Sequence, residues 1–214
     1  MTDLLLIWGA GGHGRVVLDA ARSTRTFERI VFMDEDHKRM GHAFCDCPLI
    51  GGSEKLHSLT GCAFIIAIGN NRIRSQCFGR ALAGDLLPAA LIHATAIISP
   101  TARIGRGTVV MAGAIVNAGT VIDENCIINS GAIIEHDCRI QPHAHISPGV
   151  VLGGGVSVGR LAHIGIGAIV LPGATVGEES IVGAGAVVLR EAPAHCTSVG
   201  VPAKALLRAA GSKI

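Results

Sequence analysis

The chain has no tyrosine and very few other aromatic or charged residues. Its 214 residues include one Trp and five Phe, and only 16% of them are charged. Because 49% are hydrophobic, an intrinsically disordered, charge-rich chain is excluded. The net charge of +2 gives no broad positive surface, so no nucleic-acid partner is expected. The core must be built from aliphatic side chains, and function must lie in individual motifs.

The N-terminal segment has neither the basic residues of an export signal nor an apolar run long enough to span a membrane. We therefore expect a cytoplasmic protein without a membrane span. In that compartment the seven scattered cysteines are interpreted as reduced thiols. Cys45 and Cys47 lack the spacing and the second pair that a common zinc site requires, and no metal is expected.

Residues 1–92 alternate between apolar runs and segments with helical spacing. They predict strands over 4–8, 30–33, 63–68 and within 86–92, and helices over 15–23 and 73–82. Strands that alternate with helices form a parallel sheet with right-handed crossovers. A segment of this length holds one small unit of this kind, so we predict a Rossmann-like α/β domain over residues 1–92.

Residues 93–214 follow a repeat of six. Ile98 and every sixth residue after it, as far as Val188, are aliphatic, and the fourth residue after each is small or β-branched. This period is typical of a parallel β-helix, in which three hexads form one triangular coil of 18 residues. We therefore predict a β-helix domain over 93–214, with a short C-terminal helix over 203–210 covering its end.

Residues 18 positions apart are expected to lie above one another on neighbouring coils. His136 then stacks between Ala118 and Gly154, two small residues that leave room for a ligand, and His145 stacks on His163. An imidazole in such a gap can accept a proton near neutral pH. His136 is therefore a candidate general base, and the Gly154 N–H, one coil away, is a candidate donor to an oxyanion.

A glycine-rich turn follows the first expected strand. Gly9, Gly11 and Gly14 fit the G-x-G-x-x-G spacing, in which the backbone can approach a phosphate at a helix N-terminus. Asp34 ends the second strand, where an acid can bind a ribose hydroxyl. The domain is too small for a dinucleotide, so a single nucleotide diphosphate is favoured. A tight turn without a ligand is the alternative, and His13 could cap the helix instead.

Four motifs occur in a fixed order along nearly the whole chain. They are Gly-Ala-Gly-Gly-His-Gly at 9–14, Ile-Gly-Asn-Asn at 68–71, Ile-Glu-His-Asp at 134–137 and Gly-Val-Pro-Ala-Lys at 200–204. With the hexad repeat, they resemble the PglD/NeuD-type sugar acetyltransferases. This resemblance implies a nucleotide-sugar-binding domain before a left-handed β-helix. It also implies acetyl-CoA as co-substrate and a homotrimer with sites between subunits.

The resemblance assigns roles to particular residues. It implies that His136 is the catalytic base and that Asp137 orients its ring. The glycine turn and the resemblance together give the expected substrate-binding residues Gly9, Gly11, Gly12, His13, Gly14, Asp34, Glu35, Asp36, Gly69, Asn70 and Asn129. The expected acetyl-CoA contacts are His145, Gly154, Ile166 and Ala184.

The favoured function is an N-acetyltransferase acting on the amine of a nucleotide-diphosphate-linked amino sugar. UDP, GDP and TDP stay open as the nucleotide. PglD-like relatives acetylate such amines, whereas NeuD-like relatives are associated with O-acetylation of sialic acid, which is the first alternative. A non-catalytic trimeric scaffold is the second. A zinc site built from His143, His145 and His163 is not favoured, because their pattern matches no known zinc β-helix family.

Overall fold

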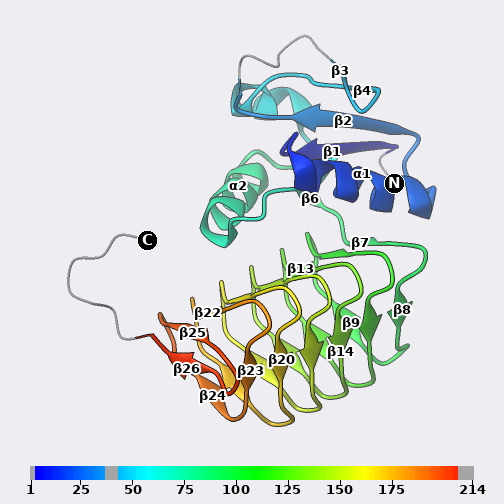
Figure 1. Cartoon of the computed structure of the whole chain (residues 1–214). Coiled ribbons are helices and arrows are strands. Elements are labelled where there is room, and N and C mark those ends of the chain that lie inside the picture. The colour runs from blue at the N-terminus through cyan, green and yellow to red at the C-terminus, as the bar shows by residue number, and fades with distance from the viewer. Residues whose placement is uncertain (1–2, 37–42, 207–214) are drawn as a thin grey trace.

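The computed structural model describes residues 3–36 and 43–206 and shows two parts, one packed on the other (Figure 1). The N-terminal part is a parallel sheet with the strand order β2–β1–β5–β6. Its strands are β1 (Leu4–Trp8), β2 (Arg29–Met33), β5 (Ala63–Ile66) and β6 (Leu87–Pro88). Counted within the sheet, the order is 2-1-3-4, as in flavodoxin-like doubly wound sheets, so the predicted small Rossmann-like α/β unit is confirmed.

Two helices connect these strands and bury aliphatic or aromatic side chains beneath them. Helix α1 (Gly12–Thr24) buries Val17 and Leu18 against Leu5 and Ile7. Helix α2 (Asn71–Ala83) buries Phe78 on the other side of the sheet. The short strands β3 (Ala43–Phe44) and β4 (Cys47–Pro48) and the 3-10 helix η2 (Ser53–Leu59) complete this part. They were not predicted, because elements this short show no periodicity.

The second part is a parallel β-helix with three faces. Face 1 contains β7 (Leu91–Ile92), β10 (Val109–Val110), β13 (Ile127–Ile128), β16 (His145–Ile146), β19 (His163–Ile164), β22 (Ile181–Val182), β25 (Thr197–Val199) and β26 (Lys204–Ala205). Face 2 contains β8 (Ile97–Ile98), β11 (Ile115–Val116), β14 (Ile133–Ile134), β17 (Val151–Leu152), β20 (Ile169–Val170) and β23 (Val187–Val188). Face 3 contains β9 (Arg103–Ile104), β12 (Val121–Ile122), β15 (Arg139–Ile140), β18 (Ser157–Val158), β21 (Thr175–Val176) and β24 (Glu191–Ala192).

Strand pairing joins residues 18 positions apart as far as Val188, as the hexad arithmetic predicts, whereas the last coil pairs residues 16 apart, such as Thr175 with Glu191. Val116 pairs with Ile134, and Ile134 pairs with Leu152 on the next coil. These second residues of each strand point inward and are at most 1% exposed. The small residues at the fourth position after them, such as Ala132 and Ala168, are fully buried in the same core. The repeat therefore specifies both the strands and the inward side.

The structure differs from the prediction at both ends of the β-helix. The strand expected within 86–92 is divided, because Leu87–Pro88 pairs with the N-terminal sheet while Leu91–Ile92 begins face 1. The helix expected over 203–210 is wrong for its described part, since Lys204–Ala205 pairs antiparallel with β25. The last coil presents an unpaired strand edge, and this strand satisfies it. Residues 207–210 of that expected helix lie outside the described residues.

The N-terminal domain lies over the first coils of face 1 (Figure 1). The outward residues Leu91, Val109 and Ile127 pack beneath α1 and are at most 1% exposed. The equivalent residue four coils further along from Val109, Ile181, is 46% exposed. Face 1 is thus covered at its beginning and open towards its end. Among the described residues, no helix is long and apolar enough to cross a membrane.

Candidate functional site

His136 and Asp137 form a side-chain pair at the corner between faces 2 and 3, just after β14. Nδ1 of His136 and Oδ2 of Asp137 are 2.9 Å apart. Asp137 has a left-handed backbone (φ 59°), and its carboxylate lies against Gly119, where an added Cβ would be 2.5 Å from Oδ1. The absence of a side chain at Gly119 therefore leaves the space in which Asp137 turns back to the imidazole.

The hydrogen bond determines which nitrogen of His136 is free. In the neutral ring the proton is assigned to Nδ1, where it can be donated to Asp137, and the Nε2 lone pair is open. The imidazole is 62% exposed, and the bond to Asp137 raises the pKa of His136 above its usual value. A Cβ on Gly154 would lie 2.5 Å from Nε2. The ring of His136 therefore packs against Gly154, one coil away, where any side chain would collide with it.

The glycine-rich turn contains glycines of two kinds. A Cβ on Gly14 would lie 2.2 Å from the carbonyl oxygen of Gly9, and one on Gly9 (φ 121°) would lie 2.7 Å from that of Ala67. These two glycines shape the turn. Gly11 and Gly12 instead face open space at the N-terminus of α1. The turn thus exposes backbone at a helix N-terminus, where a phosphate is favoured.

The predicted acidic residues lie beside this turn. Asp34 accepts the N–H of Ala10 at 2.6 Å and the N–H of Asp36 at 2.9 Å, so its carboxylate fixes the turn. Glu35 lies 3.6 Å from Arg80. Together with Gly9 they line a cavity of about 310 Å³ at the carboxyl ends of the strands, where ligands bind in such sheets.

The loop between β5 and α2 brings Gly69 and Asn70 towards face 1. The Oδ1 atom of Asn70 accepts the N–H of Ile73 at 3.0 Å and caps α2. Both residues line a second cavity, of about 600 Å³, which His163 and Ile181 border from the β-helix. The cavity thus lies between the two domains and is bordered by both.

Three histidines form a column that joins the glycine turn to face 1. The rings of His145 and His163 stack at 4.7 Å, as predicted, and His13 lies 6.4 Å from His145. Asn129 contacts His145 at 3.3 Å. Burial lowers the pKa of His145 to about 3, with the charges of His163 and Arg74 adding to the effect, and burial lowers that of His13 to about 4. Both imidazoles are therefore neutral hydrogen-bonding groups at neutral pH.

Ile166 and Ala184 lie on the corner between faces 1 and 2, on neighbouring coils. Both are exposed, and Ile166 is 63% exposed. They lie on the open end of the β-helix, towards the C-terminus from His145. Their positions suit a ligand that extends along the coils.

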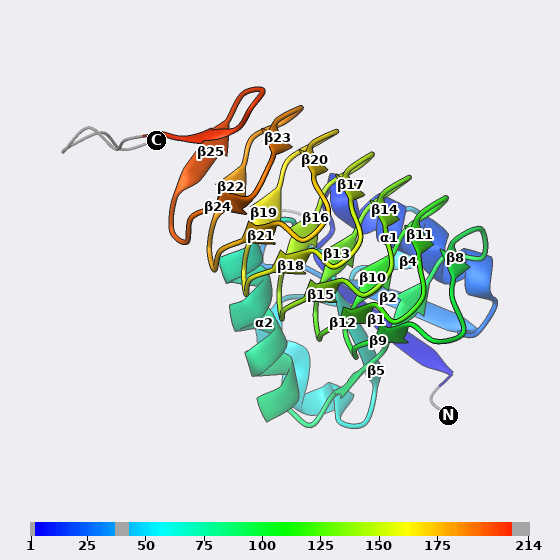
Figure 2. The same cartoon turned by 90° about the horizontal axis from the view of Figure 1, so that it is seen from below.

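One chain does not bring all the predicted site residues together. The glycine turn and the histidine column lie over face 1, whereas His136 lies at the opposite corner, between faces 2 and 3. Figure 2 shows β14 and β15 in front and the N-terminal sheet behind the β-helix. A six-residue side of a coil spans at most about 20 Å at ~3.3 Å per residue. Within one chain, His136 and the glycine-rich turn therefore lie on opposite sides of the three-faced β-helix.

Sequence reasoning missed two buried polar residues of α2, Asn71 and Arg74. Their relative exposures are 8% and 1%, and both side chains bond to backbone carbonyls of the β-helix. The available signal was their spacing, since residues 71, 74, 78 and 81 fall on one helical face. Polar residues at buried helical positions indicate that the helix docks on exposed carbonyls.

A half-size Rossmann-like sheet on a hexapeptide β-helix, with a histidine–carboxylate pair at a coil corner, defines a hexapeptide-repeat transferase. The PglD N-terminal domain model matches residues 4–81, and the bacterial transferase hexapeptide model matches 101–136 and 119–154. The acetyltransferase domain of PglB from Neisseria gonorrhoeae FA1090 is 39% identical, with a TM-score of 0.92 over 96% of this chain and 100% of that one. The chain belongs to the PglD-type family of sugar acetyltransferases.

Two further relatives have named substrates. A histidine-to-asparagine variant of perosamine N-acetyltransferase from Caulobacter crescentus, in complex with CoA and GDP-perosamine, is 37% identical with a TM-score of 0.89. That match covers 94% of this chain and 96% of the other. UDP-N-acetylbacillosamine N-acetyltransferase from Bacillus subtilis (strain 168) is 40% identical over 104 residues. The chain matches about half the length of that curated relative, 48% of each.

Proposed function

We propose that this protein transfers the acetyl group of acetyl-CoA to the amine of a nucleotide-diphosphate-linked amino sugar. The observation that carries the proposal is the free Nε2 on the exposed ring of His136, which Asp137 orients. The relatives support the acceptor class, because the perosamine enzyme is complexed with CoA and a GDP-linked amino sugar.

The chemistry follows from this arrangement. The glycine turn and its cavity hold the nucleotide diphosphate, and the sugar amine lies beside Nε2 of His136. The amine nitrogen attacks the thioester carbonyl carbon while its proton passes to Nε2. Among the described residues no backbone acceptor takes the Gly154 N–H, so this group can donate to the oxyanion that forms. Collapse breaks the carbon–sulfur bond, and the proton on His136 passes to the departing CoA thiolate.

In this proposal the acetyl donor runs along the corner between faces 1 and 2, at the open end of the β-helix. His145 and the exposed backbone near Ile166 and Ala184 offer contacts along successive coils. Asn129 and the glycine-turn residues lie on the acceptor side. The neutral state of His145 suits a hydrogen bond to a thioester or an amide, because the neutral imidazole offers one donor and one acceptor nitrogen.

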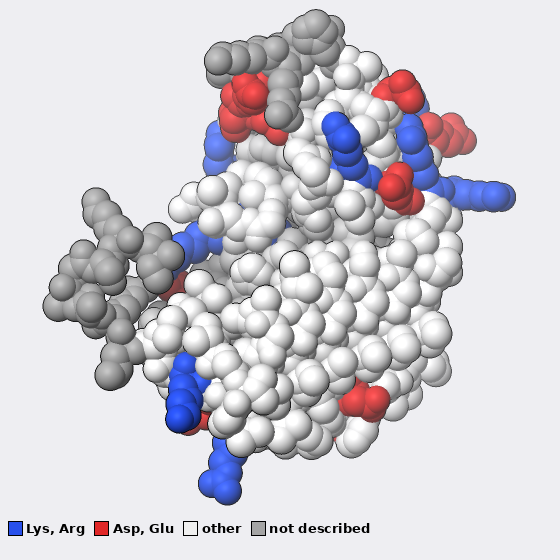
Figure 3. Space-filling model, viewed as in Figure 1, with Lys and Arg blue, Asp and Glu red and all other residues white. Residues whose placement is uncertain are grey.

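The separation of His136 from the glycine turn favours a homotrimer with sites between copies. On face 2 every outward strand residue is β-branched and aliphatic: Ile97, Ile115, Ile133, Val151, Ile169 and Val187. Face 3 instead presents Arg103, Val121, Arg139, Ser157, Thr175 and Glu191. Figure 3 shows few charged side chains over the strands of the β-helix on this side of the molecule. A continuous apolar stripe beside His136 suits contact with a second copy.

The function is tested with a CoA-release assay against a panel of UDP-, GDP- and TDP-linked amino sugars. We expect turnover with at least one member, which fixes the reaction and the nucleotide together. Silence across the panel, combined with turnover of free sialic acid, would move the acceptor from an amine to a hydroxyl. The scaffold alternative is tested by the effect of CoA on the stability of the fold. A ligand with a micromolar dissociation constant, added at 100 times that value, stabilises the folded protein by ~2.7 kcal/mol. If CoA gives no stabilisation, the protein is a scaffold.

Replacing Asp137 with asparagine is expected to move the acidic limb of the pH–rate profile to lower pH. The acidic limb reports protonation of the base, and Asp137 raises the pKa of His136 mainly through their hydrogen bond. Removing the carboxylate lowers that pKa, so the neutral base persists at lower pH. We also expect kcat to fall by about tenfold or more, because the ring loses its orientation. An unchanged or upward-shifted limb would contradict this role of Asp137.

A further inference from the structure

Helix α2 runs along a single column of coil corners. The column consists of residues 18 positions apart, all with left-handed backbones: Gly107, Asn125, His143, Leu161 and Glu179. A helical turn rises 5.4 Å and neighbouring coils are about 4.8 Å apart, so successive turns of α2 meet successive corners. Phe78 packs where a side chain at Gly107 would be, and Asn71 donates to the carbonyl of Leu161 at 2.9 Å.

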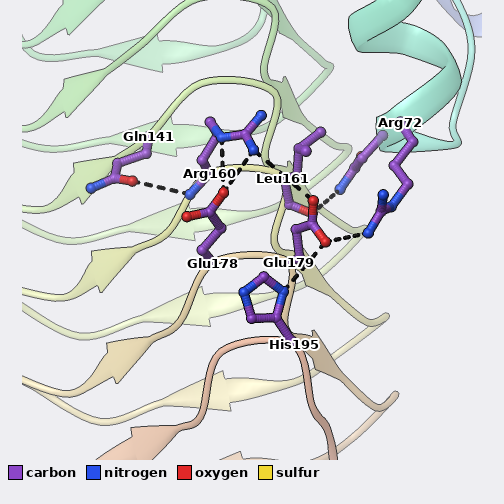
Figure 4. Close-up of polar contacts among 8 residues, drawn as sticks. Arg72, Gln141, Arg160, Leu161, Glu178, Glu179 and His195 are labelled. Carbon is purple, nitrogen blue, oxygen red and sulfur yellow. Dashed lines mark hydrogen bonds and ion pairs between the residues drawn. The ribbon is translucent and has the colours of Figure 1, made fainter.

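The open end of this column is joined by charged side chains. Figure 4 shows Arg72 of α2 reaching Glu179, which Arg160 and His195 also contact. Arg72 is 71% exposed, so this ion pair is screened by solvent and contributes little to the docking of the helix. The buried contacts further along α2 must hold the two domains together.

Arg74 makes the most extensive of these buried contacts. Its Nε donates to the Asn125 carbonyl at 3.1 Å, and its Nη2 donates to the carbonyls of His143 at 2.6 Å and Ala144 at 3.3 Å. Its Nη1 donates to the carbonyls of Ile68 at 3.2 Å and Gly69 at 3.3 Å. Three acceptors thus belong to the β-helix and two to the loop before α2. Within residues 3–36 and 43–206, no carboxylate forms an ion pair with Arg74.

A buried cation held only by carbonyls is costly, so its retention calls for a specific role. The carbonyls of Asn125 and His143 lie at corners outside the strand ladder, and the guanidinium supplies donors to both. The same guanidinium also donates to the carbonyls of Ile68 and Gly69, immediately before Asn70. A guanidinium has five donors in a fixed fork, whereas a lysine ammonium has three on a flexible stem. Only the fork can hold both sets of carbonyls in one geometry.

We propose that Arg74 is a positioning residue, whose guanidinium fixes the loop 68–70 against the second and third coils of the β-helix. This inference rests on the proposed function, in which Gly69 and Asn70 border the nucleotide-sugar site. Arg74 itself is 1% exposed and reaches no substrate. It acts through the loop, so its loss should affect the acceptor substrate and leave the acetyl donor, along the far corner of face 1, unaffected.

The test compares Arg74→Lys with Arg106→Lys. Arg106 lies on a coil corner and is 59% exposed, with Glu124 3.0 Å away, so its replacement removes the same group without loosening the loop. For Arg74→Lys we expect the KM for the nucleotide-linked amino sugar to rise at least tenfold, while the KM for acetyl-CoA changes less than twofold. Hydrogen exchange in the segment 66–75 should accelerate at least tenfold, with the coil strands of face 2 unchanged. Arg106→Lys should match the wild type in all three measurements.

Other outcomes separate the positioning role from a purely structural one. Equal rises in both KM values, or faster exchange throughout the β-helix, would show general destabilisation and overturn the proposal. Wild-type KM values and exchange in Arg74→Lys would overturn it as well. If the wild-type protein acetylates no nucleotide-linked sugar, the proposed function fails, but the exchange of segment 66–75 still decides whether Arg74 fixes the loop.

Discussion

Replacing His136 with alanine is expected to lower kcat by about 10²–10⁴-fold, the usual contribution of a general base. The acceptor amine must lose a proton as it attacks the thioester, and Nε2 of His136 is the acceptor that the site provides. The imidazole is 62% exposed and hydrogen-bonds to Asp137, so its removal leaves no cavity in the core. We therefore expect the thermal midpoint to stay near that of the wild type. CoA release with both substrates saturating measures the loss of kcat.

The matched control is His57→Ala. His57 is an exposed histidine on η2, and it lines neither of the two cavities described above. It lies outside the proposed machinery, so its removal should leave turnover unchanged. Near wild-type turnover by His136→Ala would refute the assignment of the base. An equal loss in both variants would point to a general effect of removing a surface imidazole.

The β-helix could be predicted from the sequence because its rule is local and repeats. Each coil places an aliphatic residue inward and a small residue at the corner, so a count of six gives strand, side and stacking together. Ile92 already fits this count six residues before Ile98, which could have shown that face 1 begins there. The C-terminal strand at Lys204–Ala205 follows no repeat, since it depends on the unpaired edge that only the assembled last coil creates.

The two halves of the candidate site were predictable, but their relative placement was not. His136 and His145 are nine residues apart, half a coil, which already places them on opposite sides of the prism. The sequence does not reveal which face the N-terminal domain covers, because that contact is long-range and without period. It depends on single residues such as Arg74, whose five carbonyl partners lie up to 70 positions away in sequence.

A mixture of two inactive variants, His136→Ala and Gly11→Val, is expected to regain about one third of wild-type activity in trimers that contain both. Gly11 faces open space with an extended backbone (φ −100°), so a valine side chain fits the fold and fills the proposed phosphate position. If each site takes its base from one copy and its glycine turn from another, every trimer that contains both variants has one intact site among its three. Co-expression with two affinity tags, followed by CoA release from doubly purified protein, measures the recovery.

In the control, the Gly11→Val chain is replaced by a chain that carries both Gly11→Val and His136→Ala. No site in that mixture has a base, so no recovery is expected, and any activity there would reveal contamination by wild-type chains. If both variants fold and assemble but their mixture stays as inactive as its parents, each site must lie within one chain. The chain would then have to bring His136 from the corner between faces 2 and 3 around to the glycine turn over face 1. Such a movement would unpair the strands that join each coil to the next, Ile134 with Leu152 among them, at the cost of the buried core. A site shared between copies requires no such movement, because a neighbouring molecule can present its own corner to the open end of face 1.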